Sequence, residues 1–303
     1  MIRPFFSIVI PIFNRSDLLI KSLDFLLNQT FTKFELLLID DGSTEDIYSS
    51  VQQFLLDNPN FKYIRQENKE RGAARNNGIL NAKGEYIILF DSDDYMHKNH
   101  LEVLYQGIQD NNSPSFIATK FDFINNSGSS YQSDIQKYKA GQYDYKLFLN
   151  GNPLACNICF KRELSDLILF EEDNKFAIKE DWMFLISNLK KHKLTLLDKT
   201  TITMFDHDGR SMRSGNNKII HKTKLATEWI MMNVELTQIE QEKLLAHENY
   251  FCGIHSYLDH DRKNTLLFIF KSIKYGGLKL KYLKLLMKAI IGRGIILKLK
   301  LAS

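Results

Sequence analysis

Four short apolar runs, separated by stretches of helical periodicity, fill the first 95 residues and restrict the possible folds more than any other feature. The runs cover residues 7–13, 34–39, 61–65 and 86–90. Between the first two, leucines recur at helical spacing after Ser16 and Asp17, which are placed to cap a helix. Strands that alternate with helices are typical of βαβ units. The sequence therefore predicts an α/β fold with a mostly parallel sheet flanked by helices.

Beyond residue 95 the pattern is less regular. We expect helices at residues 101–108 and 182–190, strands at 116–123 and 195–204, the latter as one strand or two, and a loop or frayed hairpin at 125–142. A loop-like composition at residues 209–217 precedes helical patterns that continue to the end. The predicted domains are therefore residues 1–215, an α/β domain, and residues 216–303, a helical C-terminal region.

Cysteine usage and hydropathy bear on the cellular compartment. Three cysteines are too few for a disulfide framework and favour a reducing compartment. Cys156 and Cys159 form a CxxC pair, but a structural zinc site needs four ligands, so we expect a packed apolar pair. We also expect no secretory signal, and no apolar stretch reaches the ~18–20 residues that cross a bilayer. These features predict a cytoplasmic protein.

Acidic residues follow several of the predicted elements. Pairs or triplets of acids occur at Asp40 and Asp41, at Asp91, Asp93 and Asp94, at Glu180 and Asp181, and around His207. Each cluster alone is typical of a solvated loop or a helix cap. The carboxyl ends of parallel strands, however, meet at one edge of a sheet, where open α/β folds bind ligands. Three carboxylates after one buried strand repel each other unless a cation holds them, so we expect a divalent ion there.

These motifs, in this order and spacing, resemble those of family 2 glycosyltransferases with the GT-A fold. The resemblance covers residues 5–95 densely and residues 96–215 sparsely, and none is recognised beyond residue 216. It is carried by SIVIPIFN at residues 7–14, NQT at 28–30, LIDDGST at 38–44, RGAARNNG at 71–78, AKGEY at 82–86 and LFDSDD at 89–94. The implied fold is a GT-A, Rossmann-like domain followed by a C-terminal helical region.

The resemblance implies a set of residues for a nucleotide-sugar donor. The expected donor-binding residues are Pro11, Phe13, Asn14, Asp41, Asn68, Arg75, Asp91, Asp93, Arg210 and Ser211. Pro11 and Phe13 would line the base pocket, and Asp41 would accept from the N3–H of uracil. Asp91 would hold the ribose or a metal-bound water. Arg75 has an alternative role, in which it locks its loop to Asp91 or to a backbone carbonyl.

The same resemblance implies the chemistry of transfer. Asp93 and His207 would ligate Mn²⁺ or Mg²⁺, which stabilises the departing nucleoside diphosphate. Asp181 would act as general base on the acceptor hydroxyl, with Glu180 as its neighbour or the second choice. In-line attack would invert the anomeric carbon and give a β-glycoside from an α-linked donor. A retaining enzyme would need a different arrangement, which the sequence leaves open.

The predicted activity is metal-dependent transfer of a hexosyl or N-acetylhexosaminyl group from a UDP-sugar. The acceptor would be a hydroxyl of a saccharide or a lipid-linked saccharide in bacterial surface-polysaccharide synthesis. Two alternatives are a non-catalytic nucleotide-sugar-binding protein and a metal-dependent nucleotidyltransferase. An NAD-binding enzyme is disfavoured because no GxGxxG follows the first strand. The pattern specifies no oligomeric state.

The C-terminal segment differs in charge from the rest of the chain. Residues 262–303 contain eleven Lys or Arg and no Asp or Glu, whereas the other 261 residues carry 29 basic and 36 acidic residues. On a helical wheel Lys281, Lys284 and Lys288 share one face, with apolar residues opposite. The helix either packs on its own domain with its lysines in solvent or makes peripheral contact with the inner face of the cell membrane through residues 264–303. No nucleic-acid-binding module accompanies the charge.

Overall fold

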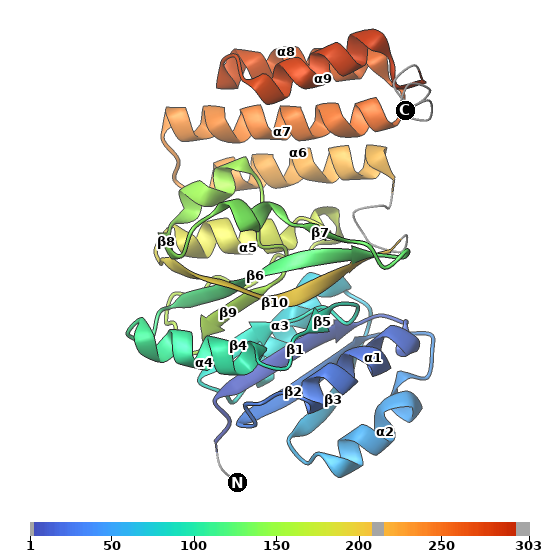
Figure 1. Ribbon diagram of the computed structural model, residues 1–303, viewed down its shortest axis with the longest axis vertical. Helices are drawn as coiled ribbons and strands as arrows, with labels where there is room; N and C mark the ends of the chain where they lie inside the picture. The colour runs from blue at the N-terminus through green and yellow to red at the C-terminus, as the bar shows by residue number, and fades with distance from the viewer. Residues whose placement is uncertain (1–2, 208–214, 295–303) are drawn as a thin grey trace. The chain divides into compact units, whose positions relative to one another are not determined.

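The computed structural model describes residues 3–207 and 215–294, and a single large sheet is its central feature (Figure 1). The chain divides into two compact units. One, here called the sheet unit, comprises Met1–Tyr145 and Asn152–His207. The other, the helical unit, comprises Lys146–Gly151 and Asp208–Ser303. The domain boundary expected at residue 215 stays a prediction.

Within the described residues, ten strands form the sheet, in the order β3-β2-β1-β4-β9-β6-β10-β5, with β7 paired to β6 and β8 to β10. Their bounds are β1 (Phe6–Ile12), β2 (Phe34–Asp41), β3 (Phe61–Gln66), β4 (Tyr86–Leu89), β5 (Tyr95–Met96), β6 (Phe116–Asn125), β7 (Ser130–Gln132), β8 (Gly141–Tyr143), β9 (Ile158–Lys161) and β10 (Leu194–Asp206). The pairs β1–β2, β2–β3, β1–β4 and β6–β10 are parallel. The predicted α/β fold with a mostly parallel sheet is confirmed.

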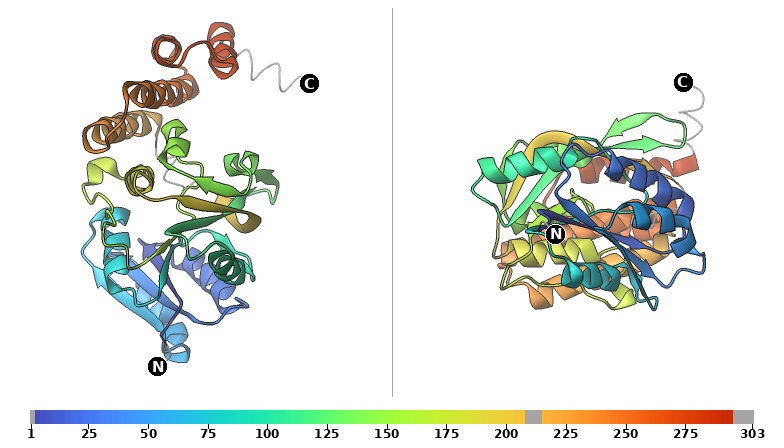
Figure 2. Two further views of the ribbon diagram at one scale, coloured as in Figure 1. Left: turned by 90° about the vertical axis from the view of Figure 1, so that its left-hand side faces the viewer. Right: turned by 90° about the horizontal axis from the view of Figure 1, so that it is seen from below.

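The helices of the sheet unit are α1 (Ser16–Leu27), α2 (Ile47–Asp57), α3 (Glu70–Asn81), α4 (His100–Asp110) and α5 (Glu180–Leu189), with short 3₁₀ turns η1 (Asp134–Lys137) and η3 (Asn174–Phe176). Helix α3 covers one face of the sheet, and α1 and α4 cover the other (Figure 2). Every residue of β1 and β2 is buried, because both faces are covered. This explains why these strands read as continuous apolar runs and not as alternating patterns.

Helix α3 approaches β1 closely, and this contact explains a glycine of the RGAARNNG motif. A Cβ atom on Gly78 would lie 2.2 Å from Val9 Cγ1, which is far inside van der Waals contact. Gly42 serves a different purpose, because its φ of +72° turns the chain out of β2. These glycines let α3 pack closely on β1 and let the chain turn after β2.

Several elements differ from the sequence-based expectations. The antiparallel strands β5 and β9 were not predicted, because two-residue and four-residue strands are too short to show periodicity. Residues 125–142, expected as a loop or frayed hairpin, hold β7, η1 and β8. β10 is one long strand whose register on β6 shifts between Leu196 and Ile202. Cys159 lies in β9, and all three cysteines are free and buried.

The helical unit contains residues 146–150 of the turn η2 (Tyr145–Asn150). Its helices are α6 (Asn216–Asn233), α7 (Gln238–Leu258), α8 (Arg262–Gly276) and α9 (Leu280–Ile291). A capping box starts α7, in which Thr237 Oγ1 accepts from Glu240 N and the Glu240 carboxylate accepts from Thr237 N. Ile269, Tyr282, Leu285 and Ala289 form a buried cluster that joins α8 and α9 to α7. Within the described residues, no helix has the length and hydropathy that a membrane span requires.

Candidate active site

The three acids that follow β4 lie together at the carboxyl edge of the sheet. The ligand oxygens of Asp91, Asp93 and Asp94 lie within 4.8 Å of one another. Ser22 of α1 fixes this turn by donating its hydroxyl to the Ser92 carbonyl at 2.7 Å. Because β4 is buried between β1 and β9, the turn that follows it lies at the edge of the sheet. Oxygen atoms at this spacing suit a single hard divalent ion.

Asp93 connects two distant parts of the chain. Its Oδ2 accepts from Arg15 Nη1 at 3.1 Å and lies 3.0 Å from His207 Nε2. The His207 ring stacks on Phe205 at the end of β10. Asp94 Oδ1 accepts from Phe205 N at 3.2 Å, so the end of β10 is fixed to the turn that carries Asp93. The structure thus brings together Asp93 and His207, the pair expected to ligate a metal.

Arg75 links the acidic edge to α5. It is 1% exposed, and it donates from Nη2 to Asp91 Oδ1 at 2.9 Å and from Nη1 to Glu180 Oε1 at 2.8 Å. This Asp91 contact is the alternative that the sequence left open for Arg75. Arg71 also pairs with Glu180, at 3.5 Å. Burial opposes ionisation of Glu180, but the charges of Arg71 and Arg75 outweigh it and lower the pKa of this carboxyl.

Asp181, next to Glu180 in the first turn of α5, has the opposite electrostatic environment. Burial, followed by the negative charge of Glu180, raises the pKa of Asp181 to about 6. Its Oδ2 accepts from Asn152 Nδ2 at 2.9 Å, and its Oδ1 accepts from Trp182 N at 2.7 Å. Two adjacent carboxyls whose pKa values are shifted apart are a recurrent mark of acid–base chemistry. One is held ionised as an anchor, and the other has the pKa of a useful base.

The ends of β1 and β2 form the neighbouring part of the same edge. Asp41 is buried, and its Oδ1 accepts from Gln66 Nε2 at 2.8 Å and from Lys69 N at 2.9 Å. Asn14 joins the two loops, because its Oδ1 accepts from Thr44 N at 2.9 Å. Both Asn14 and Arg15 have positive φ, a conformation that non-glycine residues adopt rarely. The loop after β1 is therefore held in a shape that aims Arg15 at Asp93.

The remaining predicted donor-binding residues differ in how far they are exposed to solvent. Pro11 is buried within β1, whereas Phe13, just beyond it, is 48% exposed. Asn68 is exposed, and its backbone lies against Gly42. Arg210 and Ser211 lie outside the described residues. Sequence reasoning missed Arg15, and it missed the connection that Asp94 makes to β10.

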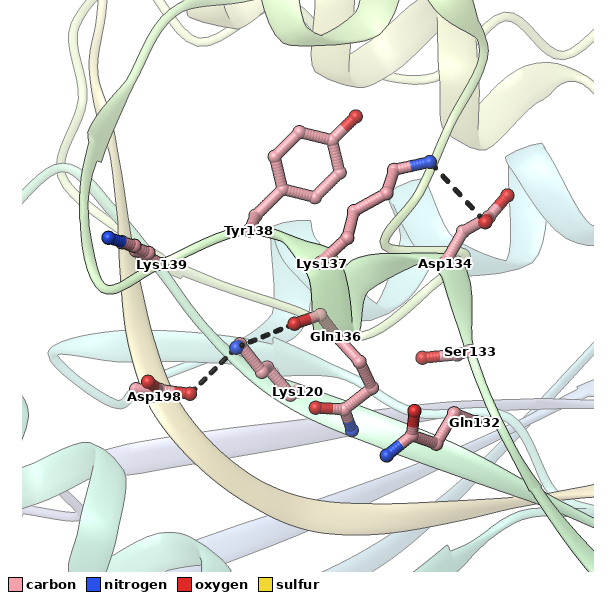
Figure 3. Close-up of a pocket in the computed structure, with 9 residues that line it drawn as sticks. All are labelled: Lys120, Gln132, Ser133, Asp134, Gln136, Lys137, Tyr138, Lys139 and Asp198. Carbon is pink, nitrogen blue, oxygen red and sulfur yellow. Dashed lines mark hydrogen bonds and ion pairs between the residues drawn. The ribbon is translucent and has the colours of Figure 1, made fainter.

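A cavity of about 670 Å³ lies apart from this edge, beside η1 (Figure 3). Lys120 lines it, with its ammonium 2.6 Å from Asp198 and 3.3 Å from the Gln136 carbonyl, and Lys137 pairs with Asp134. None of the predicted site residues that the structure describes lines this cavity. Its charges largely neutralise one another within the described residues, so we assign it no catalytic role.

Comparison with known proteins gives relatives that are named as glycosyltransferases. An uncharacterised glycosyltransferase of Rickettsia felis is 29% identical over 264 residues, which are 80% of this chain and 42% of that protein. A poly(ribitol-phosphate) beta-glucosyltransferase of Bacillus spizizenii is 37% identical over 193 residues, which are 62% of this chain and 26% of that protein. The chain thus spans less than half the length of either relative.

Comparison with solved structures gives proteins of a similar fold. The structure of S. aureus TarS residues 1–349 in complex with UDP-GlcNAc has a TM-score of 0.60 at 19% identity, covering 91% of this chain and 93% of that one. At this identity the likeness establishes the GT-A fold alone. The family model for glycosyl transferase family 2 matches residues 7–168, more than half of the chain, and these residues include the acids that follow β2 and β4. The chain therefore belongs to glycosyl transferase family 2, as its motifs predicted.

Proposed function

We propose that this glycosyltransferase moves a hexosyl or N-acetylhexosaminyl group from a UDP-sugar to a hydroxyl group, with inversion and with the help of Mn²⁺ or Mg²⁺. The acceptor is a saccharide or a lipid-linked saccharide in cell-surface polysaccharide synthesis, at the inner face of the cell membrane. One observation carries the proposal. Arg75 bonds both Asp91 and Glu180, so the carboxylate cluster and Asp181 belong to one connected site.

The donor part of the proposal is supported by the ends of β1 and β2. Among the described residues, Gln66 and Lys69 fix Asp41 through Oδ1, and its Oδ2 could accept from an imide N–H such as that of uracil. The exposed ring of Phe13 offers an apolar surface for a base. The TarS structure of the same fold contains UDP-GlcNAc, which supports a uridine nucleotide here.

The residues at the acidic edge fit a divalent cation. Asp93 and His207 would hold the ion, with Asp91 acting on the ribose or through a bound water. Carboxylate oxygens with one imidazole suit Mn²⁺ well, and carboxylates alone suit Mg²⁺. When bound, the ion neutralises charge on the departing diphosphate. Binding at Asp93 Oδ2 would compete with its ion pair to Arg15.

Asp181 is the proposed base. The acceptor hydroxyl donates its proton to this carboxylate while its oxygen attacks the anomeric carbon from the face opposite the nucleotide. A pKa near 6 leaves Asp181 ionised at neutral pH and makes it more basic than an ordinary aspartate. Asn152 orients the carboxylate by donating to Oδ2. Glu180 holds its charge against Arg71 and Arg75 and positions the start of α5, so it is not a second base.

A screen of nucleotide sugars tests the proposal. A donor that binds only the folded state raises the melting temperature, and Mn²⁺ should increase that shift. Asp93→Asn should remove the part that depends on Mn²⁺, whereas Asp181→Asn should leave binding intact and stop turnover. The product should be UDP together with a β-linked sugar. Release of pyrophosphate would indicate the nucleotidyltransferase alternative, and donor binding without turnover on any acceptor would indicate the non-catalytic one.

A further inference from the structure

Helix α9 presents three distinct faces, and the one turned outward is apolar. Its buried face carries Tyr282, Leu285 and Ala289, which belong to the cluster that joins α9 to α7 and α8. On a helix with 3.6 residues per turn, the direction opposite this face is occupied by apolar side chains between 38% and 68% exposed. They are Leu280, Leu283, Met287, Ile290 and Ile291, here called the apolar arc.

Lysines border the apolar arc on one side. Lys284 and Lys288 are exposed, and Lys281 lies over the Tyr250 ring. Within the part of the chain that the structure describes, Lys284 and Lys288 form no salt bridge, as expected where residues 262–303 contain no acid. A helix that packs on its own domain normally turns charged groups outward. Here apolar side chains occupy the outermost direction, and the lysines lie at the border of the apolar arc.

Helix α8, which packs beside α9 (Figure 1), repeats the pattern. Its buried face includes Phe268 and Ile269, whereas Leu267 and Phe270 are exposed beside Lys271 and Lys274. Two adjacent helices therefore both expose apolar side chains among lysines. Exposed apolar residues scattered singly are ordinary, but a contiguous set with charge of one sign at its border marks an interaction surface.

We propose that the outer face of α8 and α9 binds an anionic lipid membrane, with the apolar arc in the headgroup–acyl boundary and the lysines at the phosphates. A membrane interface offers both properties that this surface matches, an apolar layer and a sheet of negative charge. Lysine stems can extend along the apolar layer while their ammonium groups reach the headgroups. A second copy of this chain fits poorly, since pairing the same face would oppose lysine to lysine.

Vesicle flotation of the 303-residue chain, without donor or metal, tests this surface independently of sugar transfer. We expect the protein to float with vesicles of phosphatidylcholine containing about 30% phosphatidylglycerol, and much less with phosphatidylcholine alone. Raising NaCl from about 0.1 M to about 0.5 M should weaken binding, because the lysines are exposed to screening. Flotation that is absent, or equal on neutral and anionic vesicles, would overturn the proposal.

Matched variants locate the contact. The triple variant Leu283→Ser, Met287→Ser, Ile290→Ser should lower the partition coefficient at least tenfold, and Lys284→Gln with Lys288→Gln should lower it by about tenfold on anionic vesicles alone. The control is Leu56→Ser with Leu80→Ser, which removes exposed leucines from α2 and α3 and should change nothing. Circular dichroism melting confirms folding, which substitutions at exposed positions should preserve. If the triple variant floats as well as the unchanged protein, or if it instead dissociates a dimer seen by analytical ultracentrifugation, the membrane assignment is wrong.

Discussion

Replacing the proposed base should make the folded protein more stable relative to its unmodified form as the pH rises. The pKa of Asp181 is about 6 in the folded state, because of burial and the charge of Glu180, against an ordinary value of 3.8. Well below pH 3.8 the group is protonated in both folded and unfolded chains, so its raised pKa does not change the free energy of unfolding. Between pH 4 and pH 6 the unfolded chain ionises first, and folding of the unmodified protein becomes progressively less favourable. Asp181→Asn removes this loss.

The size of the effect follows from the two pKa values. A difference of about 2 units corresponds to about 3 kcal/mol, and partial exposure of the side chain to water reduces this to about 2 kcal/mol. The amide has one acceptor oxygen fewer, so one of the bonds from Asn152 or Trp182 is lost, at about 1 kcal/mol at every pH. The advantage of Asp181→Asn should therefore grow by about 2 kcal/mol between pH 4 and pH 7. For a chain of this size, that corresponds to about 3 °C in melting temperature.

Melting curves of the two proteins at half-unit steps of pH measure this difference directly. Glu180→Gln is the matched control with the opposite sign. The pKa of Glu180 is lowered by Arg71 and Arg75, so its contribution to stability is present above about pH 4.5 and is lost in acid. Its replacement should destabilise the protein most at neutral pH. A difference for Asp181→Asn that stays constant from pH 4 to pH 7 would refute the electrostatic assignment of the pair.

Three further changes have definite expected outcomes. Gly78→Ala should lower the free energy of unfolding by about 1–3 kcal/mol in urea titrations, since its Cβ would meet Val9, whereas Gly253→Ala, whose Cβ would have 3.4 Å of room, should be neutral or stabilising. Arg75→Met should cost about 3–5 kcal/mol, because Glu180 loses a buried partner; an effect no larger than that of Arg71→Met would count against its central position. Turnover on an identified donor should fall about tenfold per pH unit below pH 6, and a flat acid limb would exclude Asp181 as the base.

The sequence predicted the parts of the site that depend on short, local patterns. The apolar run before Asp91 predicts a buried strand, and a buried strand delivers its following residues to a sheet edge. The location of Asp41 follows from the same reasoning. His207 could be connected with Asp93 only through the family resemblance, because nothing local indicates that β10 ends beside β4.

Other features depend on tertiary contacts that no local pattern encodes. The positive φ of Asn14 and Arg15 has no sequence signal, yet it directs Arg15 to Asp93. The pairing of Arg75 with Glu180 joins residues far apart in the chain, although the i,i+4 spacing of Arg71 and Arg75 places both on one side of α3. The opposite pKa shifts of Glu180 and Asp181 arise from where those arginines lie. Adjacent carboxyls in a sequence look equivalent until their neighbours are known.

The parallel register of β10 on β6 has a consequence for how such enzymes diversify. Backbone bonds fix the two strands to each other as far as Asp206 and Asn125, and the bond from Phe205 N to Asp94 ties them to the acidic turn. The segment that follows β6 stays bonded to this framework, because β7 pairs with β6, Tyr131 donates to Asp206 Oδ2 at 2.7 Å, and β8 pairs with β10. The turns between these contacts, at residues 126–129 and 138–140, can change in length or composition while the end of β10 keeps its bond to Asp94. Sequence variation in these turns is therefore compatible with a fixed position of His207 beside Asp93.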